Sequence, residues 1–235
     1  MLITPLKTRI FKEKENLLQF IGDHINRLKD GSIVVVTSKI VALAEGRTVS
    51  LDGVEKGELI KKESQFALPG RYGWATYREG VLAMSAGIDE SNVEGKYVLL
   101  PKDSFRSARI IRDYLRERYK VKKVGVIITD SRNSPLRAGA VGVAIGYAGF
   151  RGLKKYAGTP DIFGRKFKFQ RVNVADSLAV AAVLTMGEGR ERQPVAIIEK
   201  APVDFCETVK KKELLIRPKD DIYLPFLSRL LKRKI

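Results

Sequence analysis

The chain has 235 residues, 44% of them hydrophobic and 30% charged, which is enough to bury a core in one domain or two closely joined ones. Its 44 basic and 27 acidic residues give a net charge of +17, which favours anionic partners such as nucleotides or nucleic acids. One histidine and one cysteine exclude an intrachain disulfide and a zinc site built from such residues, and no apolar run is long enough to span a membrane. With no signal-peptide pattern, we expect a cytoplasmic protein.

Helical and strand patterns alternate in the first half of the sequence. Apolar residues at helical spacing predict an amphipathic helix over residues 13–28, and a β-branched run at residues 33–36 predicts a buried strand. A helix-capping pair follows at once, so a second helix is expected over residues 39–45. The glycine-rich residues 51–95 predict strands and turns.

The second half begins and ends its elements more sharply. A capping pair predicts a helix over residues 103–119, and residues 124–128 predict a strand that ends at residues 129–131. Small and apolar residues predict a helix over residues 174–186, followed by a strand over residues 194–198.

Strands and helices that do not alternate strictly predict an α+β fold with mixed sheets, flanking helices and two closely joined subdomains. We divide the chain into a domain over residues 1–203 and a basic C-terminal extension over residues 204–235. The extension carries apolar residues at helical spacing after Tyr223, which predict a short amphipathic helix with Pro225 in its first turn. Such a helix would dock on a partner subunit, lie on a membrane or cover the core.

Polar side chains lie at or beyond the ends of three predicted strands, in the segments 37–39, 129–131 and 199–200. Strand ends deliver side chains rigidly, so functional groups are expected there. Within these segments the carboxylate of Asp130 suits a hard cation such as Mg²⁺, and it equally suits the cap of a turn. Lys39 similarly suits either a phosphate contact or a solvated position at the start of a helix.

Two further polar clusters are candidate sites. Residues 87–92 combine acidic, hydroxyl and amide groups, which suit a metal bound together with phosphate or an ordinary polar turn. Residues 186–193 combine glycines with two arginines and two acids, a composition that suits phosphate contacts. The glycine patterns of a P-loop and of a dinucleotide fold are absent, so any nucleotide site has another design.

Four stretches together resemble the coenzyme F-420-0:L-glutamate ligase (gamma-glutamyl ligase) family, in the family's order within residues 1–200: 36–47, 85–103, 125–139 and 175–188. The resemblance implies an amide-forming ligase that uses GTP to activate the carboxylate of an anionic acceptor as an acyl phosphate, which L-glutamate then attacks. It also implies Mg²⁺ or Mn²⁺ as cofactor, with K⁺ as a further candidate, and an intertwined homodimer with the site near the interface.

The resemblance also assigns roles to individual residues. Catalytic roles fall to Asp130 and Lys39. The metal ligands it implies are Asp89, Asp130, Ser131 and Glu188. The nucleotide contacts it implies are Thr4, Pro5, Leu6, Lys7, Lys39, Asn92, Met186, Gly187, Glu188, Gly189, Arg190, Glu191, Arg192 and Gln193.

The sequence departs from the family at several positions. Ser131 replaces a usual threonine, which keeps the hydroxyl, and Glu188 replaces a usual glutamine, which adds negative charge beside phosphate. Residues 133–137 read Asn-Ser-Pro-Leu-Arg where the family reads Gly-Arg-Pro-Trp-Arg. The metal-binding residues are therefore kept, while the region expected to recognise the acceptor is changed.

Three alternatives stay open on the sequence alone. The same chemistry could act on another acceptor such as a folate, because a few pocket contacts set specificity. The +17 charge also suits a nucleic-acid-binding protein, although no helix-turn-helix, zinc or RNA-recognition pattern is present. The last alternative is a degenerate member of the family that binds without catalysing.

Overall fold

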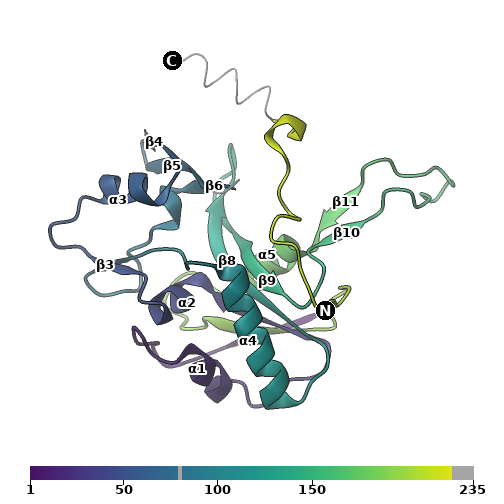
Figure 1. Cartoon of the computed structure of the whole chain (residues 1–235), viewed down its shortest axis with the longest axis horizontal. Helices are drawn as coiled ribbons and strands as arrows, with labels where there is room; N and C mark the ends of the chain where they lie inside the picture. The colour runs from purple at the N-terminus through teal and green to yellow at the C-terminus, as the bar shows by residue number, and fades with distance from the viewer. Residues whose placement is uncertain (79–80, 224–235) are drawn as a thin grey trace.

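The computed structural model describes residues 1–78 and 81–223, and its centre is a five-stranded sheet (Figure 1). The strand order is β1-β12-β2-β8-β9, and only the β2–β8 pair among these neighbours is parallel. The five strands are β1 (Leu2–Leu6), β12 (Val195–Glu199), β2 (Ser32–Thr37), β8 (Val124–Asn133) and β9 (Ala140–Ala148). The predicted mixture of strands and helices is confirmed as an α+β fold.

The middle of the sheet is apolar on both of its faces. Residues 33–36 of β2 are fully buried, as are residues 126–128 of β8, because helices cover the sheet on each side. Successive side chains alternate between the two layers: Val34 packs with α1 and α4, whereas Val35 packs with α5. The predicted strand at 33–36 is confirmed.

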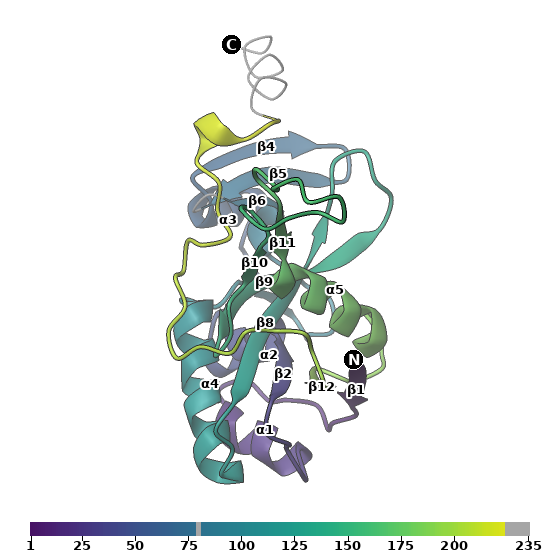
Figure 2. The same ribbon diagram turned by 90° about the vertical axis from the view of Figure 1, so that its right-hand side faces the viewer.

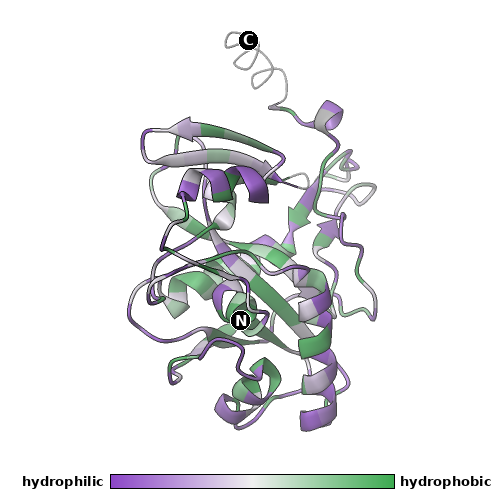
Figure 3. Cartoon of the chain, turned by 60° about the vertical axis from the view of Figure 1, so that its left-hand side comes forward, coloured by the Kyte–Doolittle hydropathy of each residue, from purple (hydrophilic) through white to green (hydrophobic). Residues whose placement is uncertain are grey.

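Three helices cover one face of the sheet and a single helix covers the other (Figure 2). The first face carries α1 (Leu17–His24), α2 (Ser38–Ala44) and α4 (Ser104–Tyr119). The opposite face carries α5 (Val174–Met186), whose bounds match the prediction. Figure 3 shows hydrophobic residues concentrated on the central strands.

Capping residues explain where these helices begin and end. Asp103 accepts a hydrogen bond from the Arg106 amide at 2.9 Å and starts α4, as predicted. The predicted helix over residues 13–28 is too long, since α1 begins only after its cap Asn16 and ends at His24. Beyond that point the chain is extended, although Ile25 and Leu28 still lie in the core.

A smaller unit with its own apolar core lies at one end of the sheet. It contains a three-stranded sheet and a two-stranded sheet: β4 (Phe66–Gly70), β5 (Gly73–Arg78) and β6 (Val81–Met84), with β3 (Thr48–Ser50) pairing with β7 (Lys96–Val98). These strands, together with a helix and a 3₁₀ helix between residues 56 and 87, pack around a cluster that includes Ile60, Ile88 and Leu99.

The prediction of strands and turns for residues 51–95 is incomplete, because this region also contains the helix α3 (Lys56–Glu63). Only Leu59 and Ile60 of α3 are buried, and most of its residues are charged or polar, so the apolar periodicity is weak. A short 3₁₀ helix, η1 (Ser85–Gly87), leads into the acidic loop at residues 87–92.

Two peripheral segments complete the described chain. β10 (Leu153–Lys155) and β11 (Arg171–Asn173) form the base of an arm that projects from the body (Figure 1). After β12 the chain crosses the α5 side of the sheet, where Phe205, Val209 and Leu214 pack on the core. It continues to η2 (Pro218–Asp220).

The Glu213 carboxylate fastens this last segment to the body. It accepts hydrogen bonds from the Tyr147 hydroxyl at 2.5 Å and from the Gly152 amide at 2.8 Å. The helix predicted after Tyr223 lies outside the described residues. Within residues 1–78 and 81–223, no helix combines the length and apolarity needed to cross a bilayer.

Candidate functional site

Asp130 and Ser131 lie inside β8, not beyond its end as predicted. The strand continues because β9 pairs with it as far as Asn133, although its parallel neighbour β2 stops at the Thr37–Thr129 pair. β8 therefore overhangs the end of β2, and the first turn of α2 lies beside the overhang. This is the position in the fold at which the candidate site is assembled.

Successive side chains of β8 point to opposite faces of the sheet at this overhang, since side chains alternate along a strand. Asp130 points to the side of α2, where its Oδ1 accepts a hydrogen bond from Ser38 Oγ at 3.2 Å. Ser131 points to the side of α5, where its hydroxyl donates to the carboxylate of Glu188, just beyond the end of that helix. Adjacent residues of β8 therefore contact Ser38 and Glu188, two residues that are far apart in the sequence.

Asp130 has the most strongly shifted pKa among the acidic residues of the candidate site. Burial raises the pKa of its carboxyl to about 6, against the opposing effect of hydrogen bonds from the Ser131 amide and Ser38, and the negative charges of Asp89 and Glu188 raise it further. The residue as a whole is half-buried, so water still reaches part of it. Three carboxylates from separate parts of the chain are close enough to influence one another here.

Asp89 is paired with Lys39. Its Oδ2 lies 2.7 Å from Lys39 Nζ, and the Ser91 amide and hydroxyl each donate to its carboxylate at 2.8 Å. Burial acts to raise the pKa of Asp89, but the hydrogen bonds from Lys39 and Ser91 outweigh it and hold the pKa below its ordinary value. The acidic loop is tied in this way to the start of α2, with Asn92 next along the chain.

The loop at residues 186–193 meets the end of β1. The Thr8 amide donates to the Arg192 carbonyl at 2.9 Å, and the Thr37 amide donates to the Pro194 carbonyl at 3.0 Å. Gly187 ends α5 with a φ of +81°, a conformation that favours glycine, and Glu191 folds back so that the Gly189 amide donates to it at 2.8 Å. Residues 4–7 therefore lead towards this loop, and their nucleotide contacts stay a prediction.

The third predicted strand end does not belong to the site. β12 runs antiparallel to β2, so Glu199 lies near the start of β2 and not near its end. It pairs with Leu2 of β1, and its carboxylate is 3.0 Å from Lys29 Nζ. The expectation that residues 199–200 join the other two strand ends is therefore wrong. The residues of a strand do not indicate whether it runs parallel or antiparallel to its neighbours.

Ser38 lies in the segment 37–39, where the sequence predicts functional groups, but its contact with Asp130 was not predicted. It was expected to help cap a helix, yet the N-cap of α2 is Thr37, whose side chain makes no capping hydrogen bond within the described residues. Ser38 is instead buried and donates to Asp130. A hydroxyl that immediately follows a buried strand was the available signal, and the capping interpretation obscured it.

The donor chemistry of the overhang fits a divalent cation. Carboxylates of Asp89, Asp130 and Glu188 with the hydroxyl of Ser131 are hard oxygen donors of the kind that Mg²⁺ and Mn²⁺ prefer. The pKa of Asp130 is raised first by burial and only then by the negative charges of Asp89 and Glu188, and a bound cation would favour its ionised form. Among the described residues, no three acidic, histidine or cysteine side chains already form a compact cluster, since Asp89 pairs with Lys39 and Glu188 with Ser131.

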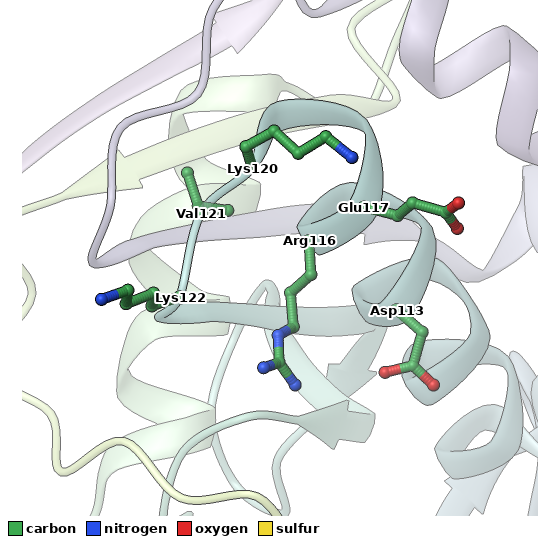
Figure 4. A pocket seen from close by; sticks show the side chains of 6 residues that line it. All are labelled: Asp113, Arg116, Glu117, Lys120, Val121 and Lys122. Atoms are coloured by element: carbon green, nitrogen blue, oxygen red, sulfur yellow. The ribbon is translucent and has the colours of Figure 1, made fainter.

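A separate surface hollow lies at the end of α4 and carries none of the predicted site residues (Figure 4). It is near the start of β8, at the opposite end of that strand from Asp130. Its lining is Asp113, Arg116, Glu117, Lys120, Val121 and Lys122. We assign no role to it in the site.

Comparison with known proteins agrees with the order of these motifs. A family profile described as F420-0:Gamma-glutamyl ligase matches residues 5–71 and 74–200. The chain is 35% identical to the "Coenzyme F420:L-glutamate ligase" of Methanocaldococcus jannaschii, over 93% of this chain and 94% of that protein. Proteins of the same description from Methanopyrus kandleri and Archaeoglobus fulgidus are 34% and 33% identical, over 93% and 80% of this chain and 95% and 83% of their own lengths.

Proposed function

The chain belongs to the F420-0:Gamma-glutamyl ligase family, and we propose that it uses GTP to join L-glutamate to a carboxylated, anionic acceptor of the coenzyme F-420 type. The proposal rests above all on Asp130, a half-buried carboxylate beside the first turn of α2 that accepts a hydrogen bond from Ser38 and whose pKa is raised in part by the charges of Asp89 and Glu188. The family resemblance supplies the reaction, and the +17 net charge suits a set of substrates that are all anions.

The chemistry has two steps. A carboxylate is a poor electrophile, so one oxygen of the acceptor first attacks the γ-phosphorus of GTP, and GDP leaves. The amine of glutamate, which has lost a proton, then attacks the resulting acyl phosphate at carbon. Inorganic phosphate departs and an amide bond is formed.

The side chains of the overhang have distinct tasks in this proposal. Asp89, Asp130, Ser131 and Glu188 would hold Mg²⁺ or Mn²⁺, which when bound supplies neutralisation of charge on the triphosphate. Lys39 and the arginines of residues 186–193 hold the phosphate oxygens, and Ser38 keeps the Asp130 carboxylate in place. The main task of the protein is to bring anions together in a fixed orientation.

An assay of released phosphate, with mass spectrometry of the products, tests the proposal. The purified protein is given glutamate, GTP or ATP, Mg²⁺ or Mn²⁺, and either a coenzyme F-420 precursor or a folate. Extension of the deazaflavin acceptor with GTP supports the proposal in full. If the deazaflavin acceptor is extended with ATP but not with GTP, the assignment of GTP as the nucleotide is wrong. If no combination gives product, the ligase function is wrong.

Another acceptor is the second candidate, and the turn between β8 and β9 motivates it. Residues 133–137 differ from the family pattern, and Leu136 is 98% exposed with a φ of +58°. A changed and open turn at the end of the strand that carries Asp130 could alter which acceptor is recognised. Extension of a folate, with none of the deazaflavin, would favour this candidate over the first.

We also propose that the chain acts as a homodimer. The outer face of the small sheet is apolar and open: Phe66, Leu68, Leu82 and Met84 are between 37% and 53% exposed, and they occupy matched positions on β4 and β6. Exposed apolar faces of this kind often mark interfaces. Light scattering of the purified protein gives the mass, and Leu82→Asp should shift a dimer towards monomer. A monomeric wild type would refute this part of the proposal.

A further inference from the structure

Lys39 is engaged by three oxygen atoms in the acidic loop. Its Nζ lies 2.7 Å from Asp89 Oδ2, and it donates to the Ser91 carbonyl at 2.6 Å and to the Ser91 hydroxyl at 3.0 Å. A lysine ammonium has three N–H donors, so these contacts use its full capacity. The charge of Lys39 is therefore directed at Asp89 and not outwards to a phosphate.

Both carboxylate oxygens of Asp89 also have partners. Ser91 donates to Asp89 Oδ1 through its amide and to Oδ2 through its hydroxyl, each at 2.8 Å. Oxygen donors arranged around a compact positive charge are also what a divalent cation requires. The ammonium of Lys39 and a metal ion would therefore seek the same carboxylate.

We propose that Lys39 is an internal counter-ion of Asp89, which yields that carboxylate to a divalent cation and then turns its ammonium to the phosphates of the nucleotide. This inference rests on the proposed function, since it concerns the metal and nucleotide of that site. It gives Lys39 a second task, which is to neutralise Asp89 until the substrates arrive. The order of events follows from charge: Asp89 exchanges one cation for another and is never left unpaired.

Partial exposure makes this exchange feasible. The side chains of Lys39 and Asp89 are 24% and 47% exposed, so water screens their attraction. The flexible stem of lysine lets the ammonium move without a shift of the backbone. By contrast, Arg47 is paired with Glu63 at 2.7 Å with side chains only 18% and 13% exposed, which suits a fixed structural pair.

The test is a Mn²⁺ titration of the nucleotide-free protein, with free Mn²⁺ measured by electron paramagnetic resonance. Lys39→Met removes the competing charge, so Mn²⁺ should bind on the order of tenfold more tightly. Lys56→Met is the matched control, because Lys56 pairs with Glu90 at 3.3 Å, next to Asp89 in the chain but not on its carboxylate. This control should change Mn²⁺ affinity by less than about twofold.

Nucleotide binding should respond with the opposite sign. Lys39→Met removes a phosphate contact, so the affinity for GTP in the presence of saturating Mn²⁺ should fall while Mn²⁺ affinity without nucleotide rises. Lys39→Gln serves as a second variant of the same expectation, and thermal melts check that each variant is folded. A lysine with only a phosphate-binding role would lose GTP affinity without any gain for Mn²⁺.

The outcomes separate this inference from the proposed function. Asp130→Asn identifies the relevant site, because Mn²⁺ binding there should be lost in that variant. If the wild type binds Mn²⁺ in an Asp130-dependent way but neither Lys39 variant binds it more tightly, the counter-ion role is refuted and the ligase function stands. An equal gain in Mn²⁺ affinity in Lys56→Met also refutes it, since the loss of any nearby positive charge would then explain the gain. If neither the wild type nor the Lys39 variants show Asp130-dependent Mn²⁺ binding, the counter-ion role is refuted, and the ligase function is decided by the product assay alone.

Discussion

The two sides of the β8 overhang differ in how firmly their groups are held. On the α2 side, Asp130 is half-buried, bonded to the buried Ser38 and perturbed in its pKa. On the α5 side, Ser131 and Glu188 are exposed, and Glu188 lies in a glycine-containing loop. The α2 side is therefore preorganised by packing, whereas the α5 side can adapt to its ligand.

This contrast suggests a division of labour at one strand. A preorganised carboxylate costs stability but needs no rearrangement when charge develops, which is how enzymes gain rate. An adaptable loop costs little and can close on substrates of differing shape. Substitutions on the α2 side should consequently produce large effects, and conservative ones on the α5 side should produce small effects.

The largest effect is expected for Asp130→Asn. Loss of this carboxylate removes the central ligand of the proposed metal site, so turnover in the phosphate-release assay should fall roughly a thousandfold. Asp52→Asn, in an exposed turn, is the control for loss of one negative charge and should be close to wild type. Turnover within tenfold of wild type in Asp130→Asn would mean that the preorganised side does not carry the reaction.

The same carboxyl makes stability depend on pH. Its pKa is about 6 when folded, against an ordinary 3.8, so its favourable contribution is complete below pH 3.8 and is lost as pH rises through 6. The loss reaches at most about 3 kcal/mol, and access of water to this half-buried residue reduces it. Urea unfolding of chelator-treated protein at pH 5 and pH 8 should show the decline for wild type, and Asp130→Asn should flatten it. An unchanged slope in the variant would contradict the assignment.

Much of the scaffold on which these groups lie was predictable from local signals. The bounds of α5 follow from its small apolar residues and the glycine after them, and α4 follows from its capping aspartate. β2 follows from its β-branched run. By contrast, α3 is short and charged, so its few apolar residues carried too little periodicity to predict it.

The site was less legible than the scaffold, because it depends on pairing between distant segments. The sequence placed Asp130 after a strand, but β9 extends that strand beyond it. Likewise, nothing in residues 199–200 shows that β12 runs antiparallel to β2. The roles of Asp89 and Glu188 came from family resemblance, and only the fold shows that both raise the pKa of Asp130.

An intermediate effect is expected for Ser38→Ala, which tests the preorganised side without removing a charge. A hydrogen bond to a charged group contributes about 1.5–3 kcal/mol, so turnover should fall on the order of tenfold or more. The pKa of Asp130 should rise further, because the bond favours the ionised carboxylate. Ser177→Ala is a control, since that exposed hydroxyl donates to the carbonyl of Asn173, the N-cap of α5, on the side of the sheet away from α2. Equal activity in both variants would remove Ser38 from the site.

The smallest effect is expected for Glu188→Gln, on the adaptable side. The amide oxygen of glutamine can still accept from the Ser131 hydroxyl, so the geometry is preserved. The lost negative charge lowers the pKa of Asp130 in the folded protein, so the pH-dependent decline in stability should be smaller than in wild type and should end at lower pH. Turnover should stay within about threefold, because an exposed charge is screened by water. A hundredfold loss would show that both sides of the overhang are equally constrained, and the distinction between them would then have no functional meaning.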